Sequence, residues 1–240
     1  ACGAYEEAVA QLSRALERVH ELPEGAEREQ QELLLQLALG PALRTTKGFT
    51  APEVEKAYGR AAELCTRAGE GPQRWQALVG LWLFYYARAD VQRARDLAEQ
   101  LLQSARPAGD AWHLFLGHYA VGITLYLQGE LCDVREHLQQ AFDLDGPLRQ
   151  RLDTLPYEAV DWLVANRVWR ANVLLSLGYP DQAVRASRES VALAQEIGGP
   201  FALTSALFFG GALHQLLGDV EVARERVEAA IALATEHGFY

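Results

Sequence analysis

The chain has 240 residues and a mass of 26.5 kDa, and half of its residues are hydrophobic while 22% are charged, a mix typical of a folded domain rather than of a disordered segment. Its net charge of −10 argues against nucleic acid and against an anionic membrane surface as partners. The longer apolar runs are too short or too interrupted to span a bilayer, and no signal peptide opens the sequence.

A helix-turn-helix phrase recurs along the chain, with turns at Ala89, Gly129, Gly178 and Gly218 that are 40, 49 and 40 residues apart. In chain order, the spacing predicts the second helix of a truncated repeat at 1–22, then helix pairs at 26–68, 72–105, 110–143, 157–197 and 200–237, with an inserted loop at 144–156.

The turns have a physical reason. A small residue at the turn permits the left-handed backbone that ends the first helix of each pair. Because neither helix of a pair can bury its apolar face alone, successive pairs must stack. The sequence therefore predicts one all-α domain over 1–240, a right-handed α-solenoid of about five and a half repeats.

The inserted loop lengthens the middle interval from 40 to 49 residues and carries Gly146, Pro147 and Pro156. An insertion in a repeat array usually maps to a loop on one face. It is either a tolerated surface excursion or a loop that contacts a ligand or partner, and the sequence leaves both interpretations open.

Small residues at fixed offsets give two units a family resemblance. Gly122, Gly129 and Ala141 mark one unit, and the other has Gly211, Gly218, Ala223 and Ala230. This pattern resembles tetratricopeptide (TPR) repeats, although the period of 40 exceeds the usual length of about 34 and Ala171 and Trp82 replace the eighth-place glycine in two units. The resemblance implies a TPR-like solenoid.

Longer phrases are similar to the C-terminal repeat region of bacterial proteins that carry an adenylate/guanylate-cyclase-like domain and an AAA-type ATPase. They are residues 35–43 (LQLALGPAL), 46–49 (TKGF), 51–55 (APEVE), 177–183 (LGYPDQA) and 229–239 (AAIALATEHGF). The resemblance implies a bacterial, cytoplasmic regulatory module cut from a longer protein.

Motifs for catalysis are missing from the sequence. It contains no phosphate-binding G-x-x-x-x-G-K-[ST] loop, no H-E-x-x-H or C-x-x-C metal motif and no G-x-S-x-G elbow. His113 and His118 are five residues apart, about 140° around a helix, so they do not converge on a metal. The three scattered cysteines predict a reducing, cytoplasmic compartment. We predict no enzyme, no catalytic or metal site and no cofactor.

In solenoids of this family the first helix of each pair lines the concave side. The resemblance therefore nominates a set of mostly aromatic and amide side chains as partner-binding residues, namely Gln76, Tyr86, Tyr119, Tyr126, Arg167, Trp169, Arg170, Asn172, Phe208 and Gln215. These side chains either pack against neighbouring repeats or form a groove for an apolar helix or peptide.

Arg167 and Arg170 interrupt the apolar pattern of this face. They could bind an anion or an acidic segment, or they could pair with Glu158, Asp161 or a carboxylate on a neighbouring helix.

The function predicted from these features is a non-enzymatic scaffold that binds an unidentified protein or peptide, upstream domains of the same chain included. We expect neither nucleic acid nor membrane as a partner, and a homo-oligomer stays open. The alternatives are a small-molecule-sensing repeat domain and a dimerisation module.

Overall fold

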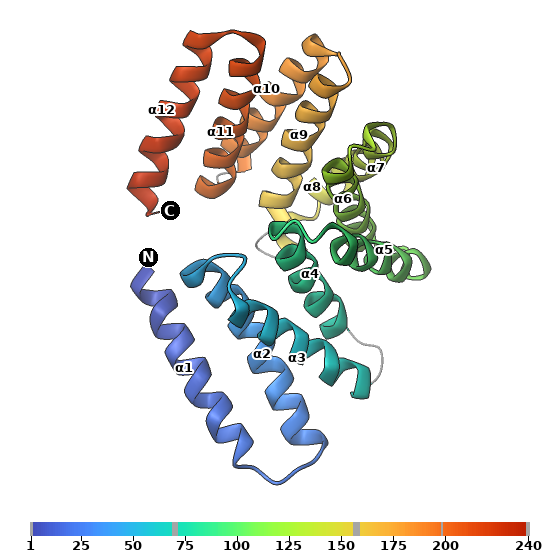
Figure 1. The fold of residues 1–240 in the computed structure, drawn as a ribbon, viewed down its shortest axis with the longest axis vertical. Coiled ribbons are helices and arrows are strands. Elements are labelled where there is room, and N and C mark those ends of the chain that lie inside the picture. Colours follow the sequence, from blue (N-terminus) through green and yellow to red (C-terminus); the bar gives the residue numbers. More distant parts are fainter. Residues whose placement is uncertain (1, 69–71, 156–158, 198, 239–240) are drawn as a thin grey trace. The chain divides into compact units, whose positions relative to one another are not determined.

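The computed structural model describes residues 2–68, 72–155, 159–197 and 199–238, and all regular elements in these ranges are helices (Figure 1). They are α1 (Cys2–His20), α2 (Ala26–Lys47), α3 (Pro52–Ala68), α4 (Pro72–Ala87), α5 (Val91–Ala108), α6 (Ala111–Gln128), α7 (Leu131–Asp143), α8 (Asp145–Arg149), the 3-10 helix η1 (Leu152–Thr154), α9 (Ala159–Ser176), α10 (Pro180–Ile197), α11 (Pro200–Leu217) and α12 (Val220–His237). The predicted start of the fourth pair, residue 157, lies outside the described residues, as does the predicted loop end at residue 156.

The contacts within the chain form two compact units, residues 1–101 and 102–240, which divide inside α5. Each unit has its own set of stacked helices. One continuous domain over 1–240 therefore stays a prediction.

Unit 1 stacks α1 to α4, each helix against the next, and α2 also contacts α4. Its core consists mainly of leucine and small side chains, with Leu37, Ala61 and Phe84 among its buried members. Glycine permits one close approach in particular. The buried ring of Tyr58 on α3 lies so near the backbones of Gly40 and Gly80 that a Cβ at either glycine would overlap it.

Unit 2 stacks α6, α7, α9, α10, α11 and α12 in the same way, so that helices adjacent in the stack contact one another (Figure 1). The first helices of successive pairs also touch, α6 with α9 and α9 with α11. Small residues again explain the spacing. A Cβ on Gly122 would lie 2.9 Å from the Leu138 side chain, and one on Gly211 would lie 2.7 Å from Val227.

The turns between paired helices have the predicted left-handed backbone. Gly129, Gly178 and Gly218 have φ angles of 77°, 84° and 83°. Ala89, at the equivalent turn, has φ 55° and is the non-glycine residue with positive φ in the described ranges. At Gly218 the backbone N–H donates to the carbonyl of Gln215, 3.1 Å away, which closes the end of α11.

The segment predicted as an inserted loop differs from that expectation. It contains α8 and η1, and Asp145 and Leu148 of α8 are buried. α8 contacts both α6 and α7. The segment is helical and packed because the side chains of Leu148 and Asp145 have partners inside unit 2. A search of the sequence for turn residues does not detect such contacts.

One helix among the described residues, α11, is long and apolar enough to cross a membrane by length and composition, with a mean hydropathy of 1.2. It contacts α9, α10 and α12. One third of this apolar window is buried, so packing against these neighbours accounts for part of its composition.

Candidate functional site

Four aromatic side chains form a continuous series across the first helices of unit 2, and we call them the aromatic row. The row consists of Tyr126 on α6, Trp169 on α9, and Phe209 and Phe208 on α11. The ring centroids of Tyr126 and Trp169 are 5.3 Å apart, and those of Trp169 and Phe209 are 5.8 Å apart. Phe208 meets Phe209 edge to face at 5.3 Å. These distances are typical of interacting aromatic rings.

The row exists because α6, α9 and α11 each carry aromatic residues, and because α9 contacts both α6 and α11 directly. Tyr126, Trp169 and Phe209 are half-buried, whereas Phe208 is 53% exposed. Three rings of the row are therefore partly held by packing, and Phe208 adds apolar surface that a partner could reach. The sequence nominated three of its members and missed Phe209, whose ring is the one that contacts Trp169.

Tyr119, nominated for the same face, lies in the core. It is 3% exposed, with its ring stacked on Phe115 at 6.3 Å and meeting Trp162 at 5.4 Å. Its role in the structure is packing between α6 and α9. Trp162, which sequence reasoning did not single out, completes this contact.

The two nominated arginines of α9 lie among polar and aromatic partners. The Nη1 and Nη2 atoms of Arg167 each donate to one oxygen of the Asp145 carboxylate at 2.6 Å, and both side chains are buried. Arg170 stacks over the Phe142 ring at 3.7 Å and donates to Gln139 Oε1 at 3.3 Å. Burial lowers the pKa of Arg170. Arg167 thus pairs with a carboxylate of a neighbouring helix, the structural alternative that the sequence left open.

The remaining nominated residues lie apart from these clusters. Asn172 donates its amide to the Val168 carbonyl of its own helix at 2.9 Å, and Gln215 is exposed on α11. In unit 1, Gln76 is exposed on α4, and the half-buried ring of Tyr86 contacts Trp82 with centroids 5.9 Å apart.

Unit 1 contains an open cavity of about 570 Å³ between α1, α2 and α3. Apolar side chains that include Leu16 and Leu39 line it, and so do both lysines of the chain, Lys47 and Lys56. The carboxylate of Glu32 is buried in its wall and accepts two hydrogen bonds from Arg60, at 2.7 and 3.0 Å.

These hydrogen bonds hold the pKa of Glu32 below its usual value despite the opposing effect of burial. The carboxylate is therefore charged at neutral pH, and Arg60 compensates its charge.

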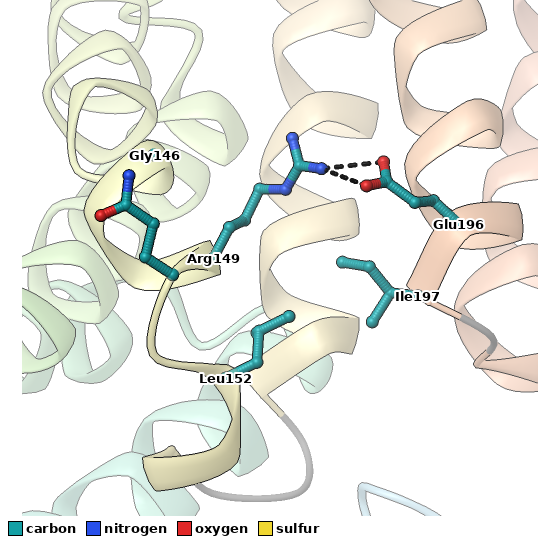
Figure 2. A pocket seen from close by; sticks show the side chains of 6 residues that line it. Gly146, Arg149, Leu152, Glu196 and Ile197 are labelled. Atoms are coloured by element: carbon teal, nitrogen blue, oxygen red, sulfur yellow. Dashed lines mark hydrogen bonds and ion pairs between the residues drawn. The ribbon is translucent and has the colours of Figure 1, made fainter.

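Unit 2 has a second open cavity, of about 540 Å³, between the inserted segment and the end of α10. Figure 2 shows Arg149 of α8 reaching across it to Glu196 of α10, with Nη2 at 2.7 and 2.8 Å from the two carboxylate oxygens. Leu152 and Ile197 supply its apolar lining (Figure 2). Because the ion pair already satisfies the charges that line this cavity, it offers less for a ligand than the aromatic row does.

Within the described ranges, no three His, Cys, Asp or Glu side chains come together as a metal-binding group. What the geometry offers is an accessible apolar surface in unit 2 and, in unit 1, a cavity lined by Lys56 and by the ion pair of Lys47 with Glu53.

No protein-family model matches the chain, and no curated protein matches it by sequence. Solved structures match it by fold. BtubC (BKLC) from P. vanneervenii is 16% identical, with coverage of 99% of this chain and 93% of its own and a TM-score of 0.66. A Rap protein complexed with Competence and Sporulation Factor is 13% identical, with coverage of 98% and 71% and a TM-score of 0.64.

A third match is a protein of nearly identical TPR-like repeats from Podosopora anserina. It is 17% identical, with coverage of 85% of this chain and 96% of its own and a TM-score of 0.57. At such identities the likeness concerns the fold alone. The chain has a TPR-like helical repeat fold, which confirms the predicted fold class.

Proposed function

We propose that this chain is a non-enzymatic module that binds a protein or peptide through the aromatic row of unit 2. The observation that carries the proposal is the continuity of the row across three successive first helices, with Phe208 exposed at one end. Large aromatic side chains contribute much apolar contact area and lose little conformational entropy when they bind. The fold suits this use, since a Rap protein of similar fold has been solved in complex with Competence and Sporulation Factor.

The row favours an apolar partner segment. All members of the row are aromatic. Arg167, which lies on α9 like Trp169, has its guanidinium group paired with Asp145. An amphipathic helix that presents apolar side chains at helical spacing would suit such a surface.

Site-specific photo-crosslinking tests this proposal. A photo-reactive phenylalanine analogue at position 208 is expected to capture the same partner peptide repeatedly, and Trp169→Ala is expected to abolish the capture. The analogue at Tyr5, which is 45% exposed on α1, is the matched control. Equal capture at positions 5 and 208, or capture that survives Trp169→Ala, would contradict the proposal.

The larger context is a further part of the proposal. The phrases quoted above support a regulatory repeat region of a bacterial signalling protein with cyclase-like and AAA-type ATPase domains. Sequencing the coding region upstream of this chain tests it. An upstream phosphate-binding loop is expected, and a reading frame without one contradicts this context.

A second candidate function is small-molecule sensing, and the cavity of unit 1 favours it. Its volume of about 570 Å³ lies in the range of ligand sites, and it combines an apolar wall with the Lys47 and Lys56 side chains. Mass spectrometry of the denatured purified protein would reveal a retained small anion. Its loss in Lys56→Ala, with the crosslinking at position 208 unchanged, would assign sensing to this cavity.

A further inference from the structure

Two histidines of one helix pair face each other in unit 2. His118 on α6 and His137 on α7 have their Nδ1 atoms 3.1 Å apart, their ring centroids 5.2 Å apart and their ring planes tilted by 38°. Both side chains are half-buried. Gly122, one turn after His118, faces the same part of α7: a Cβ there would lie 3.4 Å from the Cβ of His137 and 2.9 Å from the Leu138 side chain.

Both rings are neutral at pH 7. Burial, the neighbouring His137 and Arg106 lower the pKa of His118 to about 4. Burial also lowers the pKa of His137, against the raising effect of Glu136 and Asp133. Neutral imidazole is the form that binds transition metals, so no proton has to leave the pair before a metal enters.

The spacing of the two nitrogens suits chelation. A metal placed about 2.0–2.1 Å from each nitrogen, at this separation, would have an N–metal–N angle of about 98°. This angle lies between the square-planar and tetrahedral values. The rings need only rotate so that both lone pairs point to one position.

We propose that His118 and His137 form a two-histidine site for a divalent transition-metal ion, with Cu²⁺ bound more tightly than Zn²⁺. Imidazole is a ligand that suits both ions, and Cu²⁺ forms the stronger complexes with a given set of nitrogen ligands. The proton that one Nδ1 donates to the other in the empty pair moves to Nε2 of the same ring. Each ring then offers its Nδ1 lone pair, and no proton is released.

The surrounding charges set the strength of the site. Asp133 and Glu136 of α7 favour a cation beside His137, whereas Arg106 opposes it. No third His, Cys, Asp or Glu ligand joins the pair in the part of the chain that the structure describes. Water or an added ligand therefore occupies the other coordination positions, as in metal sites that remain open.

The test titrates the full chain with CuCl₂ or ZnCl₂ at pH 7.5 by calorimetry, and records the electron paramagnetic resonance of bound Cu²⁺. Cys2→Ser and Cys132→Ser are present throughout, so that these two thiols do not compete for the metal. We expect one Cu²⁺ per chain with nitrogen coordination. Because loss of even an outer partner of a ligand weakens metal affinity roughly 10–100-fold, His118→Gln and His137→Gln should each weaken it at least as much.

His113→Gln is the matched control, since His113 lies on the same helix and its Nδ1 is 2.7 Å from Asp110. It should leave the Cu²⁺ affinity within twofold. Circular dichroism confirms that each variant is folded. If His113→Gln weakens binding as much as His118→Gln, or if the His118→Gln/His137→Gln double variant retains the wild-type affinity and spectrum, the proposal is overturned.

Discussion

The ring of Tyr58 shows how single residues set the helix spacing in unit 1. It lies between Gly40 on α2 and Gly80 on α4, and a Cβ on either glycine would overlap it. Because the ring is confined on both sides, it cannot move away from a new methyl group. We predict that Gly80→Ala lowers the free energy of unfolding by roughly 1–2 kcal/mol, since overpacking outweighs the better helix propensity of alanine. Urea unfolding followed by circular dichroism measures this.

Gly59→Ala is the matched control for that substitution. Gly59 is inside α3 and next to Tyr58, yet an added Cβ would have no atom within 4 Å. Its expected effect is a gain of roughly 0.5–1 kcal/mol from helix propensity alone. If both variants gain stability, the ring of Tyr58 is not confined as described.

Ala89 provides a second residue-scale prediction, because it occupies a turn where the equivalent residues are glycines. Its φ of 55° is left-handed, which costs an L-residue roughly 1–2 kcal/mol. Ala89→Gly should therefore raise the free energy of unfolding by roughly 1 kcal/mol. Gly129→Ala, where an added Cβ meets no atom within 4 Å, should lower it by a similar amount. Thermal unfolding of the two variants checks the opposite signs.

At the scale of elements, the inserted segment is anchored by one buried ion pair. The side chains of Asp145 and Arg167 are only 6% and 7% exposed. Removing the carboxylate leaves the guanidinium buried without its partner, so Asp145→Ala should lower the free energy of unfolding by roughly 3–5 kcal/mol. Adding Arg167→Met to that variant should recover part of the loss. Urea unfolding of the single and double variants gives both values.

The same segment contains the control for this prediction. Arg149 and Glu196 also form an ion pair, but their side chains are 36% and 64% exposed. Because solvent screens such a pair, Glu196→Ala should cost less than about 1 kcal/mol. Similar losses in Asp145→Ala and Glu196→Ala would mean that burial does not decide the strength of these pairs.

The elements also show what the sequence could and could not predict. The 40-residue period and the turn glycines predicted the left-handed turns and the helix pairs, because both are local consequences of residue size. The period also placed Tyr126, Trp169 and Phe208 on equivalent first helices. It could not pair Asp145 with Arg167 or His118 with His137, because these contacts join residues 22 and 19 positions apart on different helices. Their distances depend on how closely the helices pack.

At the scale of the whole molecule, the contacts group into two compact units that divide within α5. In repeat proteins each helix is stabilised mainly by its neighbours, so a local loss of stability should stay local. We predict that Gly80→Ala speeds amide hydrogen exchange in α2, α3 and α4 and leaves α10 to α12 unchanged. Asp145→Ala should speed exchange in α7, α8 and α9 and leave α1 to α3 unchanged. Mass spectrometry of peptides from the exchanged protein measures both, and uniform acceleration along the chain in either variant would show that the molecule unfolds as one cooperative body.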